Sequence, residues 1–202
     1  MKKDFIYLAS ASPRRSELLR QIGVRFEVRP AEIPEDLAPG EAPEAYVLRL
    51  AAAKAAVVWS ALDAAHAEPR PVLAADTAVV LDGRVLGKPA NAVEAEAMLE
   101  QLSGRAHDVL TAVSLRCGSQ PETLLASAEV RFRATTLAER RAYCATGEPF
   151  DKAGGYGIQG HAAVFVEQLR GSYSAVVGLP LFETAALLAR CGVDFWLTAR
   201  TA

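Results

Sequence analysis

The pattern of apolar residues along this 202-residue chain predicts a mixed α/β fold. Strand-like and helix-like patterns alternate at first, and two consecutive strand-like stretches, at about 107–117 and 124–133, then indicate an antiparallel pair. The composition, 51% hydrophobic and 23% charged, is that of an ordinary globular protein. Because the chain has no internal repeat, low-complexity tract or interdomain linker, we expect a single domain over residues 1–202.

The chain opens with a predicted strand, a tight loop and a helix. Residues 5–9 form a short apolar run, and a 3.6-residue period then continues from Pro13 until it stops at Gly23. Ser12 stands at the expected N-cap and Pro13 at the first helical position.

The next part of the chain predicts a second strand, a surface loop and a long helix. Residues 24–29 alternate as a strand does, and residues 30–43 are rich in proline and acidic side chains, which is typical of a loop. The alanine-rich segment from about 44 to 66 places its larger apolar side chains on one stripe and is the clearest helix.

The remaining segments continue this mixed pattern. Residues 71–81 are almost all apolar, as in a buried strand, and Asp82-Gly83 is a hairpin signal. Asn91 can cap a helix that ends at Ser103-Gly104. The last predicted elements are a helix at about 137–146, a glycine-dense loop at 147–160, a strand at 163–169 and a helix at 180–191.

Charge and cysteine content exclude several classes of protein. The net charge of −2 provides no general basic field for nucleic acid. Cys117, Cys144 and Cys191 are odd in number and far apart, so we expect buried thiols rather than a zinc site or a disulfide. No apolar run approaches the ~20 residues of a membrane span, and the start of the chain does not have the form of a signal peptide. We therefore expect a cytoplasmic protein without a membrane partner.

A carboxylate interrupts the predicted buried strand. Asp76 lies among apolar residues, and burying an unpaired carboxylate would cost several kcal/mol, so Asp76 needs a cation, a metal or a position at a strand end. The alternative is a structural aspartate that accepts backbone hydrogen bonds. Lys88, within Gly87-Lys88-Pro89, is close in sequence, but alone it is equally an exposed turn lysine.

Cations occur on two of the predicted helices. Arg14 and Arg15 fall in a first turn, where free backbone N–H groups already favour an anion; the alternative is a solvated pair that forms surface ion pairs. Lys54 is flanked by alanines and can either reach into a groove or extend to solvent. With the glycine loop at 151–160, these cations and carboxylates form the set that metal-assisted chemistry on a polyphosphate requires.

Several motifs stand in unbroken order between about residues 5 and 190. They are Leu8-Ala9-Ser10-Ala11-Ser12-Pro13-Arg14-Arg15, Ala75-Asp76-Thr77, Gly87-Lys88-Pro89, Leu102-Ser103-Gly104-Arg105, the run Glu148 to Gly160, Gly171-Ser172-Tyr173 and Val177-Gly178-Leu179-Pro180. This set resembles the Maf family of nucleoside triphosphate pyrophosphatases. The resemblance implies hydrolysis of a nucleoside triphosphate to the monophosphate and pyrophosphate with a divalent metal. It also implies an elongated mixed sheet flanked by helices, with two lobes and a central cleft, similar to the inosine triphosphate pyrophosphatases.

The forms of the first motif and of the glycine loop are similar to the branch of the family that acts on dTTP and UTP; the 7-methyl-GTP branch differs at both places. By the same resemblance Asp76 is the catalytic acidic residue, and Arg14, Thr77 and Gln159 set base specificity. The other site residues that the resemblance implies are Ser10, Arg15, Glu35, Lys54 and Lys88.

The chemistry of two residue types agrees with these roles. A glutamine carboxamide presents one donor and one acceptor, which can face the O4 and N3–H of uracil or thymine, whereas cytosine inverts that edge. We expect one Mg²⁺ or Mn²⁺ to be held by Asp76, Glu35 and phosphate oxygens. The loop also offers Glu32 and Asp36 in place of Glu35, and Asp76 can be a metal ligand, a general base or both.

A second hypothesis is a nucleotide-binding regulator of cell division that does not hydrolyse its ligand, because the family was once described as septum formation inhibitors. The intact set of carboxylates and lysines argues against a dead site. The expected partner is a nucleoside triphosphate, with dTTP, UTP and modified pyrimidine nucleotides all open, and neither nucleic acid nor a membrane. A homodimer is also left open.

Overall fold

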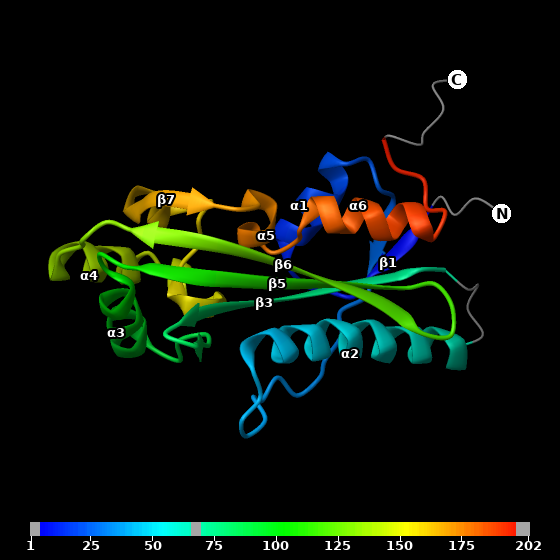
Figure 1. Cartoon of the computed structure of the whole chain (residues 1–202), viewed down its shortest axis with the longest axis horizontal. Coiled ribbons are helices and arrows are strands. Elements are labelled where there is room, and N and C mark those ends of the chain that lie inside the picture. The colour runs from blue at the N-terminus through cyan, green and yellow to red at the C-terminus, as the bar shows by residue number, and fades with distance from the viewer. Residues whose placement is uncertain (1–4, 66–69, 197–202) are drawn as a thin grey trace. The chain divides into compact units, whose positions relative to one another are not determined.

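A computed structural model of the chain describes residues 5–65 and 70–196. It confirms the predicted mixed α/β fold: seven strands form one sheet in the order β2-β1-β3-β5-β6-β7, with β4 paired to β3 (Figure 1). The strands are β1 (Ile6–Leu8), β2 (Phe26–Val28), β3 (Val72–Leu81), β4 (Arg84–Leu86), β5 (Ala106–Arg116), β6 (Pro121–Phe132) and β7 (Val166–Arg170).

The described residues pack as two compact units. The first contains the residues up to Asp76, those from Thr111 to Ala126 and those from Gly178 onward, and the second contains 77–110 and 127–177. Strand β3 contributes to both units, because the division falls between Asp76 and the next residue.

The first unit is built on parallel strands. Tyr7 of β1 pairs with Val72 of β3, and Ile6 pairs with Phe26 of β2. Helix α2 (Pro43–Ala64) covers one face of these strands, and α1 (Pro13–Gln21) and α6 (Leu181–Arg190) lie on the opposite face (Figure 1). The predicted end of α2 at His66 lies outside the described residues.

The start of α1 is as predicted in position but not in its bonding. Pro13 is the first helical residue and Ser12 occupies the N-cap position, yet the Ser12 side chain makes no capping hydrogen bond. Its backbone N–H donates instead to Oγ of Ser10, 3.2 Å away. The loop before α1 is therefore closed by Ser10, not by Ser12.

Among the described residues, helix α2 is the one helix long and apolar enough to cross a membrane, with a mean hydropathy of 1.4 over its best 18-residue window. Its apolar residues are interrupted by Arg49 and Lys54, so it contains no uninterrupted apolar run of that length. The core helix of a globular protein passes the same test. Here Val47, Leu50 and Val58 of α2 are buried, and Ala55 and Val58 pack with Val72 of β3.

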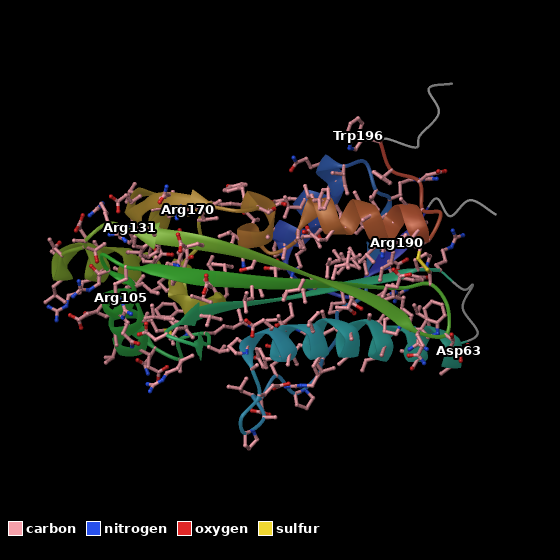
Figure 2. All side chains as sticks on the ribbon, in the orientation of Figure 1. Asp63, Arg105, Arg131, Arg170, Arg190 and Trp196 are labelled. Atoms are coloured by element: carbon pink, nitrogen blue, oxygen red, sulfur yellow. A yellow bond between two sulfur atoms is a disulfide. The ribbon has the colours of Figure 1, made fainter. Side chains whose placement is uncertain are left out.

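Two of the cysteines are bonded, which corrects the expectation of three thiols. Cys117 follows β5 and Cys191 ends α6, and their Cα atoms are 6.3 Å apart across a disulfide, seen as a yellow bond near the Arg190 label in Figure 2. They are 74 residues apart in sequence, so no spacing rule could pair them. Cys144 is a buried free thiol, as predicted.

The second unit contains antiparallel strands and further helices. The hairpin predicted at Asp82-Gly83 is confirmed, with both residues at positive φ and Val80 paired to Val85. Asn91 caps α3 (Ala92–Leu102) by accepting the N–H of Glu94. Helix α4 (Leu137–Ala145) begins with a capping box that the sequence reading missed.

The glycine-dense segment of the second unit forms short 3-10 turns at Glu148–Asp151 and Ala153–Gly155. Gly154 has a φ of +68°, and a Cβ there would lie 2.8 Å from a methyl of Val79, so only glycine fits. The predicted strand at 163–169 is wrong at its start, because His161–Phe165 is a 3-10 helix and β7 begins only at Val166. The short helix α5 (Tyr173–Val177) was not predicted.

Candidate active site

Lys54 joins the two carboxylates that the sequence singled out. Its Nζ donates to Oδ1 of Asp76 at 2.7 Å and lies 2.5 Å from Oε1 of Glu35. Lys54 and Asp76 are 8% and 6% exposed, whereas the Glu35 side chain is 42% exposed. The requirement that buried Asp76 have a cation is therefore met by Lys54, which reaches inward rather than to solvent.

Arg15 is the second cation held beside this group. Its Nε donates to the backbone oxygen of Gly178 at 2.8 Å and its Nη1 to Oγ of Ser10 at 3.1 Å. These two bonds fix the guanidinium, so Arg15 is not a solvated surface arginine.

The titration of these groups reflects their burial and their neighbours. Burial raises the pKa of Asp76, although the charges of Lys54 and Arg15 and the Lys54 hydrogen bond oppose that shift. Burial also lowers the pKa of Arg15, opposed by Asp76 and reinforced by Arg14. Arg14 and Arg15 therefore repel each other beside a carboxylate, an arrangement that an anionic ligand would relieve.

The loop that carries Glu35 is fixed to α2 by residues that the sequence reading did not identify. The Tyr46 hydroxyl donates to the backbone oxygen of Glu35 at 2.8 Å. Arg49, one turn further along α2, donates to the backbone oxygen of Asp36 at 3.1 Å and forms a two-bond ion pair with Glu41 at 2.6 Å. An aromatic and an arginine three residues apart on a helix, beside an acidic loop, were the available signal.

Three of the predicted residues, Thr77, Lys88 and Gln159, belong to the second unit. Thr77 is partly buried, Lys88 is exposed after the hairpin, and Gln159 is exposed on a turn of the glycine loop. The buried Tyr156 of the same loop is hydrogen-bonded to His107, with its hydroxyl oxygen 2.8 Å from Nε2 of the histidine. The structure thus places six of the predicted residues in the first unit: Ser10, Arg14, Arg15, Glu35, Lys54 and Asp76.

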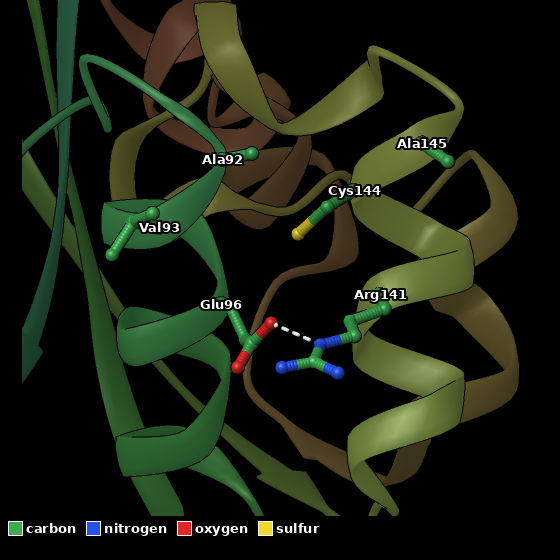
Figure 3. A pocket seen from close by; sticks show the side chains of 6 residues that line it. All are labelled: Ala92, Val93, Glu96, Arg141, Cys144 and Ala145. Carbon is green, nitrogen blue, oxygen red and sulfur yellow. Dashed lines mark hydrogen bonds and ion pairs between the residues drawn. The ribbon is translucent and has the colours of Figure 1, made fainter.

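A separate pocket lies between α3 and α4 (Figure 3). It has a volume of about 250 Å³ and is lined by Ala92, Val93, Glu96, Arg141, Cys144 and Ala145. Glu96 and Arg141 pair with each other at 2.9 Å, and burial raises the pKa of the Cys144 thiol, which makes it a poor nucleophile. None of the predicted site residues lines this pocket.

The donor set of the first unit fits a divalent cation of the Mg²⁺ type. Asp76 and Glu35 offer hard carboxylate oxygens that already converge on one cation, the Lys54 ammonium. In residues 5–65 and 70–196 no group of three or more His, Cys, Asp and Glu side chains is arranged to hold a metal. Two carboxylates completed by substrate phosphates are a usual Mg²⁺ arrangement.

Comparison with known families decides the assignment of the chain. A model of the family described as "Maf: Maf-like protein" matches residues 5–191. The chain belongs to the Maf-like protein family. The matched range contains the whole Lys54–Asp76–Glu35 group and the glycine loop with Gln159, so both sets of residues belong to the Maf-like part of the chain.

Curated relatives of this Maf-like protein cover nearly its whole length. A "dTTP/UTP pyrophosphatase" of Aromatoleum aromaticum is 52% identical over 196 residues, which are 93% of this chain and 95% of that protein. Proteins with the same description from Burkholderia pseudomallei and Chromobacterium violaceum are 51% and 48% identical, each covering at least 94% of this chain and 95% of the relative.

A solved structure, that of the Staphylococcus aureus Ham1 protein, aligns with a TM-score of 0.41 and 15% identity over 63% of this chain and 71% of that chain. The similarity is too distant to support a conclusion about the fold.

Proposed function

We propose that this Maf-like protein hydrolyses dTTP and UTP to the nucleoside monophosphate and pyrophosphate. The observation that carries the proposal is the buried Lys54–Asp76 pair with Glu35 and Arg15 beside it, in a chain about half identical to proteins described as dTTP/UTP pyrophosphatases. A regulator that only binds nucleotide is not favoured, because binding alone does not require a buried carboxylate whose ionisation is costly.

The residues of the first unit have separate roles in hydrolysis of the triphosphate. Arg15, fixed by Ser10 and the Gly178 carbonyl, presents a preorganised guanidinium that neutralises phosphate charge without reorganising. Lys54 holds Oδ1 of Asp76 and leaves the second oxygen of that carboxylate, Oδ2, to orient water or accept its proton. Arg14 adds charge at the same helix start.

Asp76 and Glu35 would hold a divalent cation, Mg²⁺ or Mn²⁺. When bound, that cation would supply charge neutralisation at the α-phosphate. Lys54 contacts both carboxylates, so its ammonium would have to share them with the metal.

Base selection falls to Gln159, with Thr77 and Arg14 as the other specificity positions and Lys88 as a phosphate-binding cation. The Gln159 carboxamide can donate to O4 and accept from N3–H of uracil or thymine, and it mismatches cytosine. The exposed position of Gln159 on a turn is suitable for contact with a ligand.

We also propose that the enzyme acts in the cytoplasm, where nucleoside triphosphates are made and used, and that it binds neither nucleic acid nor membranes. The net charge of −2 supports the second point. The Cys117–Cys191 disulfide provides a test of this location, because a reducing cytoplasm keeps such cysteines as thiols: an intact disulfide in protein isolated from cells would contradict the proposed location. Measurement of the molecular mass in solution tests for a homodimer.

The test is a phosphate-release panel. The purified chain is incubated with Mg²⁺ and each of dTTP, UTP, CTP, dCTP, ATP, GTP and 7-methyl-GTP, with inorganic pyrophosphatase added to convert pyrophosphate to phosphate. We expect turnover of dTTP and UTP and little of the others, with no phosphate released when pyrophosphatase is left out. Best turnover of 7-methyl-GTP would overturn the substrate assignment, and no turnover of any nucleotide would overturn the activity.

A further inference from the structure

One carboxylate contacts both ends of the turn that carries Gln159. Oε2 of Glu148 accepts the backbone N–H of His161 at 2.9 Å and lies 2.9 Å from Nδ1 of the same residue. Oε1 accepts the Tyr143 hydroxyl at 2.9 Å, and that hydroxyl oxygen accepts the backbone N–H of Gly157 at 3.2 Å. Glu148 therefore holds, directly or through Tyr143, the residues two positions before and two positions after Gln159.

The backbone of this turn packs directly on the Glu148 carboxylate. A Cβ at Gly160 would overlap both carboxylate oxygens. A Cβ at Gly157 would lie 3.2 Å from Oε1 of Glu148 and 2.8 Å from Cε of Lys152. The close approach of Glu148 therefore favours glycine at position 160, and at position 157 the Lys152 side chain is the nearer obstacle.

Glu148 is itself fixed and charged. Its side chain is 15% exposed, and Lys152 donates to its backbone oxygen at 2.7 Å. The Tyr143 that it accepts from is 3% exposed, with its ring edge-on to Phe165. Burial opposes ionisation of Glu148, but hydrogen bonds from His161 and Tyr143 and the charge of Lys152 outweigh it and lower its pKa. The carboxylate is therefore ionised at neutral pH.

We propose that Glu148 is a positioning residue for base selection: it holds the turn from Gly157 to His161 in the conformation in which Gln159 meets the base edge. The proposal rests on the proposed reading of the base by Gln159. An exposed glutamine on a loose turn would lose conformational entropy on each binding event, and a prefixed turn avoids that cost. Glu148 acts only through the turn, so its loss changes discrimination between bases more than turnover.

The experiment compares Glu148→Ala with Glu148→Gln, Gln159→Ala and the double variant Glu148→Ala/Gln159→Ala. The matched control is Glu139→Ala, which removes another backbone-capping carboxylate of the same unit, one that accepts the Thr136 N–H at 2.7 Å and does not contact the turn. For each protein, kcat/KM is measured with dTTP and with CTP. Hydrogen exchange of the Gly157 and His161 amides is measured without nucleotide.

We expect Glu148→Ala to lower the dTTP-to-CTP ratio of kcat/KM by about tenfold and Glu148→Gln by less, because the amide keeps one acceptor oxygen. The double variant should have the same ratio as Gln159→Ala, and both amides should exchange faster in Glu148→Ala. Glu139→Ala should leave the ratio within about twofold of the wild type.

Two results would overturn the positioning role: an unchanged ratio in Glu148→Ala although Gln159→Ala lowers it, or equal loss in Glu148→Ala and Glu139→Ala. If Glu148→Ala does not fold, Tyr143→Phe removes the hydroxyl that connects Glu148 to Gly157, leaves the bonds between Glu148 and His161, and must still lower the ratio. A wild type that does not prefer dTTP, or a Gln159→Ala variant that keeps the preference, contradicts the proposed function instead, and the exchange rates then report separately on whether Glu148 fixes the turn.

Discussion

The Nζ atom of Lys54 lies 2.7 Å from Oδ1 of Asp76, and both side chains are almost completely buried. A buried pair of this kind contributes little net stability, because desolvation of the two charges offsets most of their attraction. The pair instead keeps the Asp76 carboxylate charged at a fixed, buried position from which solvent is largely excluded. The pair is therefore better explained by chemistry than by stability.

Asp76→Asn should abolish hydrolysis and keep the fold. The amide has nearly the shape of the carboxylate and keeps an oxygen for Lys54, but it lacks the charge needed to hold a metal or accept a proton. Turnover of dTTP and the circular dichroism spectrum are the two measurements. Activity above about 10% of wild type, which is about 1.4 kcal/mol in barrier, would contradict the assignment.

Glu35→Gln should raise the Mg²⁺ concentration needed for half-maximal activity by about tenfold, and Glu32→Gln should not change it. Only Glu35 of the acidic loop contacts Lys54, which also holds Asp76. A metal titration of the initial rate, with Asp36→Asn as a second control, distinguishes the three acids. A larger effect at Glu32 or Asp36 would move the metal ligand to that residue.

Lys88→Ala and Gln159→Ala should have different effects on the preference among nucleotides. A phosphate-binding lysine acts on every nucleotide alike, so Lys88→Ala should lower kcat/KM for UTP and CTP by similar factors. Gln159→Ala should lower it selectively for UTP and dTTP, by about 1 to 3 kcal/mol in transition-state stabilisation, because a hydrogen-bond pair to the base is lost. If both variants changed all substrates by one factor, Gln159 would only shape the loop.

Stability should fall between pH 6.5 and pH 4 because of His107. Burial lowers the pKa of this histidine to about 4 in the folded protein, below its ordinary value of 6.5. The unfolded chain therefore binds a proton first as the pH falls. The free energy of unfolding then decreases by up to about 3 kcal/mol from its value at neutral pH. Urea unfolding at pH 7.5 and pH 4.5 measures the loss, and His107→Gln, which does not titrate, should show a smaller one.

A reductant should destabilise the wild type by about 2–4 kcal/mol, because the Cys117–Cys191 bond closes a long loop of the unfolded chain. Without reductant, Cys191→Ser should already have the lower stability of the reduced wild type, and adding a reductant should not lower it further. Cys144→Ala, which removes the buried free thiol, should keep the response to reductant. Equal unfolding midpoints of the wild type with and without reductant would mean that the bond does not form in solution.

The sequence predicted those features that depend on neighbours along the chain. The cap at Asn91, the hairpin at Asp82-Gly83 and the start of α1 at Pro13 each need only a few consecutive residues. The sequence predicts a strand over 163–169, but its first three residues belong to the 3-10 helix His161–Phe165, because a short apolar run has no period that separates the two. The capping box of Thr136 and Glu139 was readable in the sequence and was missed.

The site contacts could be predicted only in part. The buried position of Asp76 required a cation, and the resemblance supplied Lys54, but nothing local shows that one ammonium contacts both Asp76 and Glu35. The pairing of Cys117 with Cys191 depends on long-range packing in the same way. Glu148 is part of the glycine-loop motif, but only the structure shows its oxygens against the backbone of a turn that follows it by nine or more residues.

The discontinuity of the first unit has a consequence for the order in which the protein folds during synthesis. Lys54 and Asp76 are both made before any residue of the second unit, so their pair can form early on the ribosome. The Gly178 carbonyl that fixes Arg15, and the Cys191 sulfur that bonds Cys117, are made only after the second unit is complete. A ribosome stalled shortly after residue 177 would thus expose a chain whose Lys54–Asp76 pair can already form but whose Arg15 still lacks its bond to Gly178.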